Sequence, residues 1–322
     1  MSLEEEIAAP PWMMRLRNAV SAVFRIQFRY RMHSRSALLR KPPAVCYNPA
    51  RKQLAGSAEV RMDSAQFQQF TDTLQHTLSA DERVCALVGI GSLAQPERVD
   101  RWSDHDFWVI TTAEGQAQFL TDLSWLPEHS AIALALRPAP EYYTVLYTTG
   151  HIAEFAVFAL TDLSHGQLDR YRMLFDKDNF RAQIQAIHER TLDNQQTFDA
   201  ARAIGHFLVT LCTGAARDAR GERLSAHTYI FQYALDDLLA LITCHIPAQQ
   251  PDRIDRFDPR RRFEQAYPDL SALLEPILAL TPTAAALHLL EMAEDLFQDR
   301  MPAFPAPAAA ATRAYLQTIQ RG

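Results

Sequence analysis

Apolar residues follow two different spacings along this chain, and the change between them divides the sequence into two parts. From about residue 84 to residue 176, short apolar runs rich in β-branched and aromatic residues alternate with turn residues, which is typical of strands. From Thr191 onward the apolar residues recur every three or four positions, which is typical of helices. The pattern therefore predicts an α+β part followed by an all-α helical bundle.

Two of the expected strands enclose the most informative stretch of the chain. The first apolar run covers 84–90 and ends at Gly91-Ser92, and a polar loop that contains Pro96 follows. The second run, 107–110, is headed by Asp104-His105-Asp106. Because residues two apart on a strand share a face, Asp104 and Asp106 are expected to present two carboxylates side by side.

Two neighbouring carboxylates repel each other, and a divalent cation removes that conflict. Magnesium prefers oxygen ligands and is commonly held by one or two carboxylates together with substrate phosphates. A Gly-Ser pair after a strand lets backbone amides and a hydroxyl approach a phosphate closely. We therefore interpret Gly91 and Ser92 as phosphate-binding and Asp104 and Asp106 as metal-binding residues. The alternative is a strand end capped by acidic turn residues, with Gly91 only making a turn.

The ordered combination of Gly-Ser, a loop over 93–103 and Asp-x-Asp entering a strand resembles the nucleotidyltransferase superfamily related to polymerase beta. The sequence from Trp102 to Phe107 looks most like that of the aminoglycoside and lincosamide nucleotidyltransferases. His105 departs from the apolar or aromatic residue usual between the two aspartates. Position 105 is expected to face away from the metal, so this departure does not imply lost activity.

The resemblance implies a nucleotidyltransferase-type mixed sheet with flanking helices, and a third carboxylate from a later strand. The runs 142–147 and 152–158 bracket Thr148-Thr149-Gly150, which predicts a hairpin, and Glu154 lies in its second strand. Glu154 is the expected third metal ligand and base, with Glu222 as the alternative base. The other interpretation is that Glu154 faces water on a half-exposed strand. The run 171–175 before Asp176-Lys177-Asp178 resembles a short strand of the aminoglycoside adenylyltransferases.

The function implied by this resemblance is that of a Mg²⁺-dependent nucleotidyltransferase. It would transfer a nucleoside monophosphate, AMP from ATP, to a hydroxyl of a small molecule and release pyrophosphate. The acceptor class is aminoglycoside-like or lincosamide-like, which would suggest antibiotic resistance. The alternatives are a catalytically weak nucleotide-binding regulatory module and a nucleotidyltransferase that acts on a protein.

Helix signals flank the expected strands and fill the rest of the chain. The expected helices are 62–79 with a start cap at Asp63-Ser64, 113–123, 179–190 capped by Asp178, 198–216, 225–246, 273–280, 284–297 and 312–320. The Pro/Ala-rich segment 302–311 is expected to be a linker. These elements divide the chain into an N-terminal helical extension (1–58), with an amphipathic helix over 12–32, a catalytic domain (59–190) and a C-terminal helical domain (191–322).

The composition indicates which classes of partner the chain can be expected to bind. The chain has 322 residues and a formal net charge of -6, so no basic excess indicates nucleic acid, and a small or basic co-substrate fits better. The four cysteines have no C-x-x-C spacing, which argues against zinc and disulfide frameworks and favours the cytoplasm. No apolar stretch reaches the roughly 18 residues of a membrane helix, so no membrane partner is expected.

Overall fold

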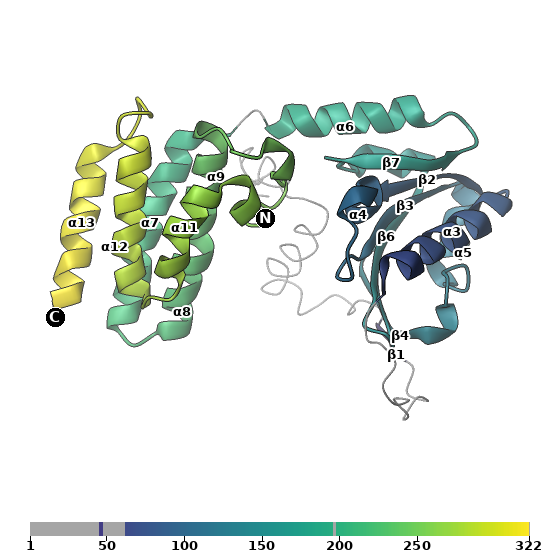
Figure 1. Ribbon diagram of the computed structural model, residues 1–322, viewed down its shortest axis with the longest axis horizontal. Helices are drawn as coiled ribbons and strands as arrows, with labels where there is room; N and C mark the ends of the chain where they lie inside the picture. Colours follow the sequence, from purple (N-terminus) through teal and green to yellow (C-terminus); the bar gives the residue numbers. More distant parts are fainter. Residues whose placement is uncertain (1–44, 48–61, 196–197, 322) are drawn as a thin grey trace, which may run out of the picture. The chain divides into compact units, whose positions relative to one another are not determined.

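The computed structural model describes residues 45–47, 62–195 and 198–321, and the chain divides into two compact units, 1–195 and 196–322. The first unit is an α+β unit and the second is helical (Figure 1). This is the fold class that the spacing of apolar residues predicts. The helix expected over 12–32 lies outside the described residues.

The first unit is built on a seven-stranded mixed sheet in the order β1-β4-β5-β6-β3-β2-β7. Only β3 and β6 pair in parallel, and the other neighbouring strands are antiparallel. The expected hairpin is present as β5 and β6. The edge strand β1 lies within the segment expected to be a helical extension and pairs with β4. The strands are β1 Val45–Tyr47, β2 Val84–Ile90, β3 His105–Thr111, β4 Ile132–Ala139, β5 Tyr142–Tyr147, β6 Ile152–Ala159 and β7 Tyr171–Asp176.

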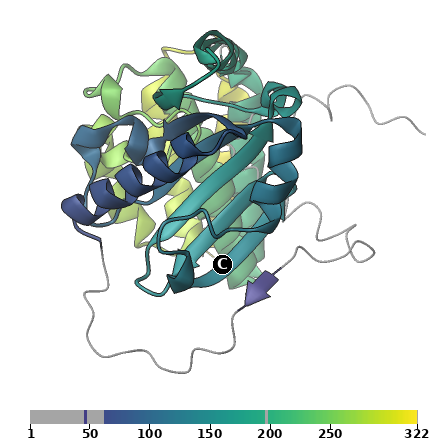
Figure 2. The same cartoon turned by 90° about the vertical axis from the view of Figure 1, so that its right-hand side faces the viewer.

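Helices pack on both faces of the sheet, and Figure 2 shows α3 lying across one of them. On one face, α3 (Ser64–Ala80) and α5 (Ala113–Thr121) pack on Phe107 and Val109 of β3. On the other face, η4 (Leu160–His165) and α6 (Arg181–Gln195) pack on Trp108 and Ile110. The alternation along β3 therefore sends odd-numbered side chains toward α3 and even-numbered side chains toward α6.

The ends of these helices follow the capping chemistry of their sequences, with one exception. Asp63 caps α3 in a capping box with Gln66, as expected. The expected cap of α6, Asp178, is wrong. Asp176 instead accepts hydrogen bonds from the amides of Phe180 (2.9 Å) and Arg181 (3.1 Å). The reason is that α6 begins two residues later than expected, which places Asp176 within reach of its first amides.

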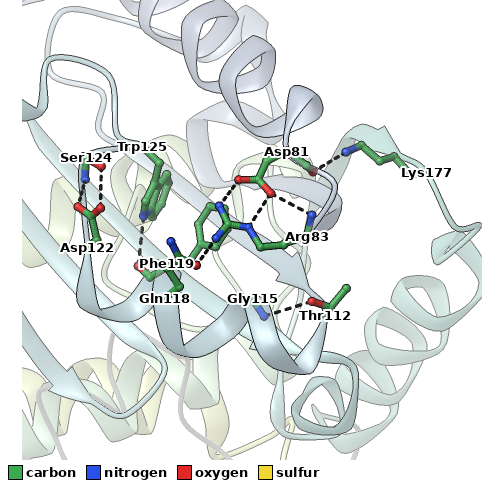
Figure 3. A network of polar contacts seen from close by, with 10 residues as sticks. All are labelled: Asp81, Arg83, Thr112, Gly115, Gln118, Phe119, Asp122, Ser124, Trp125 and Lys177. Carbon is green, nitrogen blue, oxygen red and sulfur yellow. Dashed lines mark hydrogen bonds and ion pairs between the residues drawn. The ribbon is translucent and has the colours of Figure 1, made fainter.

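A polar network holds the end of the sheet where β2 begins and β3 and β7 end (Figure 3). Arg83 donates to the Asp81 carboxylate from its backbone amide and its Nε, both at 2.9 Å, and also donates to Gln118. Lys177, just after β7, donates to the carbonyl of Asp81 at 2.8 Å. The resemblance segment Asp176-Lys177-Asp178 thus belongs to the end of the sheet opposite to Gly91 and Asp106.

The second unit is a helical bundle around one apolar core. Its described helices are α7 Ala200–Ala219, α8 Arg223–Thr228, the π-helix η5 Tyr229–Ala234, α9 Leu235–His245, η6 Pro251–Arg253, α10 Phe263–Ala266, α11 Pro268–Leu278, α12 Pro282–Phe297 and α13 Ala306–Arg321. The expected linker over 302–311 is wrong in its second half, because α13 already begins at Ala306. Alanine is the strongest helix former, and Pro307 is tolerated in the first turn.

Within the described part of the chain, no helix combines the length and apolar character needed to cross a membrane.

Candidate active site

A row of side chains crosses four strands where β3 and β6 begin. Asp106 of β3 is in register with Glu154 of the parallel neighbour β6 and with Ile90 at the end of the antiparallel neighbour β2. Glu154 is in turn in register with Thr144 of β5, whose hydroxyl donates a 3.0 Å hydrogen bond to Glu154 Oε1. Because residues in register share a face of the sheet, Asp106 and Glu154 present two half-buried carboxylates side by side.

The turn after β2 is built against this pair. Gly91 has a φ of +53°, which favours glycine, and begins the short helix α4 (Gly91–Ala94). A methyl group at Gly91 would lie only 2.3 Å from Asp106 Oδ2. Glycine is therefore needed here for two reasons, the backbone conformation and the close approach of the Asp106 carboxylate.

Asp104 takes a different position from the other two carboxylates. It is half-buried like them, but it precedes the first residue of β3 and has no partner in the strand ladder. Among the described residues, no three His, Cys, Asp or Glu side chains gather closely enough to hold a metal ion. The structure thus brings Asp106 and Glu154 together and leaves Asp104 beside them at the start of the strand, because the pleat that aligns side chains begins only at His105.

The chemistry of these donors fits magnesium. The oxygens of Asp106 and Glu154 are hard ligands, and Gly91 leaves room beside Asp106 that a Cβ would fill. Magnesium keeps several waters and is usually held by one or two carboxylates plus substrate phosphates. A pair of aligned carboxylates beside an open turn is therefore a sufficient protein contribution, and a closed cage of protein ligands is not required.

His105 lies on the opposite face of β3, as expected from strand alternation. It is fully buried and stacks on Phe67 of α3 with ring centroids 3.8 Å apart. Its Nδ1 lies 2.9 Å from His151 Nε2, and its Nε2 lies 3.0 Å from Thr71 Oγ1. Burial lowers the pKa of His105 to about 3 and that of His151 to about 4. Both rings are therefore neutral at physiological pH and anchor the start of β3 and β6 to α3.

Ser92, expected to bind phosphate, lines a cavity of about 190 Å³ between α3, the turn after β2, and β7. Polar groups from all three elements line it, including Gln68, Thr71 and Arg172. The cavity therefore adjoins the turn that contacts Asp106. Gly91 lies against the Asp106 carboxylate, and its neighbour Ser92 lines the cavity.

Glu222, the alternative base, is a structural residue of a helix–helix turn in the second unit. It accepts 2.9 Å hydrogen bonds from Arg220 Nε and Arg217 Nη1, next to Gly221 with a φ of +76°. Hydrogen bonding from Arg220, and then from Arg217, lowers the pKa of the Glu222 carboxyl. Glu222 is thus a carboxylate that is already paired with two arginines, and such pairing makes a carboxylate a weaker proton acceptor.

Three residues near the site were missed from the sequence. Thr144 and His151 gave no signal, because their partners Glu154 and His105 come from other strands. Arg172 did give one, since it is a charged residue inside an otherwise apolar strand, between Tyr171 and Met173. A charge at such a position is expensive to bury unless it has a partner.

No family model and no curated protein matches the chain. Among solved structures, it is similar to an aminoglycoside 6-adenyltransferase from Bacillus subtilis, with 15% identity, 79% of this chain and 95% of that chain covered, and a TM-score of 0.27. It is similar to a nucleotidyltransferase-like protein from Exiguobacterium sibiricum, with 12% identity, coverage of 78% and 75%, and a TM-score of 0.30. It is also similar to a c-di-GMP synthase from Capnocytophaga granulosa, with 12% identity, 97% of each chain covered and a TM-score of 0.23.

The first two of these proteins carry in their names the class that the sequence motifs resemble. At such TM-scores, they supply neither a substrate nor a residue role for this chain. The structure itself shows a mixed sheet, Gly-Ser directly after β2, Asp-x-Asp at the start of β3, and a carboxylate on the parallel strand β6. The sheet thus places these three motifs on the adjacent strands β2, β3 and β6.

Proposed function

We propose that this protein is a Mg²⁺-dependent nucleotidyltransferase that transfers AMP from ATP to a hydroxyl of a small molecule and releases pyrophosphate. The observation that carries the proposal is the register pair of Asp106 and Glu154 on parallel strands, with Gly91 in contact with Asp106. Acidic turn residues with only a capping role would not require two carboxylates aligned on adjacent strands, where they repel each other.

Each residue has a role in this proposal. The acceptor oxygen attacks the α-phosphorus, the bond from that phosphorus to the bridging oxygen breaks, and pyrophosphate leaves. Asp106, Glu154 and Asp104 would hold magnesium, which when bound neutralises the triphosphate and polarises the phosphoryl oxygens. Ser92 and the amide next to Gly91 bind the β- and γ-phosphates. Glu154 accepts the proton of the acceptor hydroxyl, a role that needs an approach of about 3 Å.

The environment of Glu154 supports its role as the base. Its Oε1 already accepts a hydrogen bond from Thr144, which fixes the orientation of the carboxylate. Fixed orientation matters because much of the rate of phosphoryl transfer comes from positioning and charge stabilisation. The acceptor is a small molecule, since the chain has a net charge of -6 and lacks the basic excess typical of nucleic-acid partners.

The test is pyrophosphate release from ATP and Mg²⁺ with a panel of aminoglycosides, lincosamides and amino-sugar metabolites. Asp106→Asn and Glu154→Gln should each reduce acceptor-dependent release by more than about a hundredfold. Glu114→Gln is the matched control, because Glu114 is an exposed carboxylate on α5. Release that is unchanged in both site variants would refute the assignment. Silence with every acceptor, together with clear ATP binding, would instead support a protein acceptor or a catalytically weak regulatory module.

A further inference from the structure

The cavity behind the Gly91-Ser92 turn has the chemistry of an anion site. Its polar lining consists of Ser64, Gln68 and Thr71 from α3, Ser92 from α4 and Arg172 from β7. Among the described residues that line it, Arg172 is the one charged group and none is acidic. The Thr71 hydroxyl already donates to the carbonyl of Phe67 at 2.9 Å. The guanidinium, the Gln68 amide and the hydroxyls of Ser64 and Ser92 offer several hydrogen-bond donors to a negatively charged ligand.

Arg172 is incompletely satisfied by the described residues. Its Nε is buried and has no hydrogen-bond partner among them. A buried polar atom without a partner is costly, and in native proteins it usually indicates a bound group or a catalytic task. Arginine is also the residue best suited to hold phosphate oxygens, because its planar fork can donate two parallel hydrogen bonds.

The position of Arg172 is set by the sheet. Arg172 is the register partner of Gly89 on β2, and Leu93 of α4 packs so closely over Gly89 that a Cβ there would lie 2.8 Å from the Cβ of Leu93. The glycine lets α4 lie directly on the sheet beside Arg172. The same short turn therefore touches Asp106 through Gly91 and faces the cavity of Arg172 through Ser92.

We propose that Arg172 binds the terminal phosphates of the nucleoside triphosphate in this cavity, together with the Ser92 hydroxyl. The inference rests on the proposed function and extends it by naming the residue that balances the charge of those phosphates. Asp106 and Glu154 alone would repel a triphosphate. Arg172 is in register with Gly89, and Gly89 with Phe107, so its guanidinium lies on the α3 face, behind the Gly-Ser turn, and offsets that repulsion only for terminal phosphates that reach around the end of β2.

The experiment is titration calorimetry of the full chain with ATP, tripolyphosphate and AMP in the presence of Mg²⁺. Arg172→Met removes the guanidinium while keeping roughly the length of the side chain. It should weaken the binding of ATP and of tripolyphosphate by between about tenfold and a hundredfold. AMP, which has no terminal phosphates, should bind equally to both proteins. Arg172→Lys keeps the charge without the fork and should give an intermediate loss. Arg181→Met is the control, since Arg181 is an exposed arginine of the same unit.

Thermal unfolding without nucleotide separates binding from a structural role. Arg172→Met should unfold at the wild-type temperature, because the Nε of Arg172 has no hydrogen bond to lose. Equal ATP binding by wild type and Arg172→Met would overturn the inference and leave the proposed function standing. Wild-type protein that binds no nucleotide would overturn both. Unfolding of both Arg172 variants, or equal weakening by Arg181→Met, would show that Arg172 acts through the fold or through overall charge.

Discussion

Replacing Gly91 with alanine adds one methyl group at the point where the turn after β2 contacts Asp106. The methyl carbon would lie 2.3 Å from Asp106 Oδ2, whereas ordinary van der Waals contact begins at 3.4 Å. The carboxylate oxygen must therefore move by about 1.1 Å, the difference between these two distances. The backbone must also keep a φ of +53°, which costs alanine roughly 1–2 kcal/mol.

These two effects have different readouts. Misplacement of a reacting or metal-binding group by about 1 Å can reduce the rate by about a hundredfold. We therefore expect Gly91→Ala to lower acceptor-dependent pyrophosphate release by about that factor. The loss of unfolding free energy, measured in urea, should be no more than about 1–2 kcal/mol from the backbone plus the cost of moving one side chain.

Gly221→Ala is the matched control for backbone strain. Gly221 has a φ of +76°, but nothing lies within 4 Å of an added methyl group. It should show a similar loss of unfolding free energy, about 1–2 kcal/mol, with pyrophosphate release and ATP binding unchanged. If Gly91→Ala retained full activity, the contact between Gly91 and Asp106 would have no functional meaning and the site assignment would fail. If Gly221→Ala lost as much activity, strain alone would explain the effect.

Three further outcomes follow from the structure. In the unfolded chain, histidines bind protons below about pH 6.5, whereas burial lowers the pKa of His105 to about 3 and that of His151 to about 4. The unfolded state therefore binds more protons, and the free energy of unfolding should fall as the pH drops below about 6.5, by up to about 1.4 kcal/mol per pH unit for each ring. His105→Asn should reduce this slope, as measured by urea unfolding at several pH values. Phe207→Ala should cost about 3–5 kcal/mol in urea unfolding of the helical unit, since Phe207 is fully buried, and a cost under 1 kcal/mol would contradict the packing. Asp63→Ala should lose about 1 kcal/mol by removing the cap of α3, and Asp63→Asn should retain most of it.

The sequence by itself predicted the elements that carry the site. Apolar runs marked β2, β3, β5, β6 and β7, because a short β-branched run between turn residues has few other stable conformations. Gly-Ser marked the end of β2 and Asp-x-Asp marked the start of β3, which lie next to each other in the sheet. Helix caps were predictable where the chemistry is local, as at Asp63, and less so at Asp176, where the start of α6 differs by two residues from the expected one.

Only the tertiary structure decided which of these residues meet. Asp106 and Glu154 lie on strands that pair in parallel, and the register of such a pair is set by packing on both faces of the sheet, which no local pattern encodes. The same holds for Arg172, whose charge was visible in the sequence but whose cavity exists only because α3, α4 and β7 surround it. Local spacing thus determined the candidate carboxylates, whereas long-range strand pairing selected Asp106 with Glu154 and left Asp104 outside the ladder.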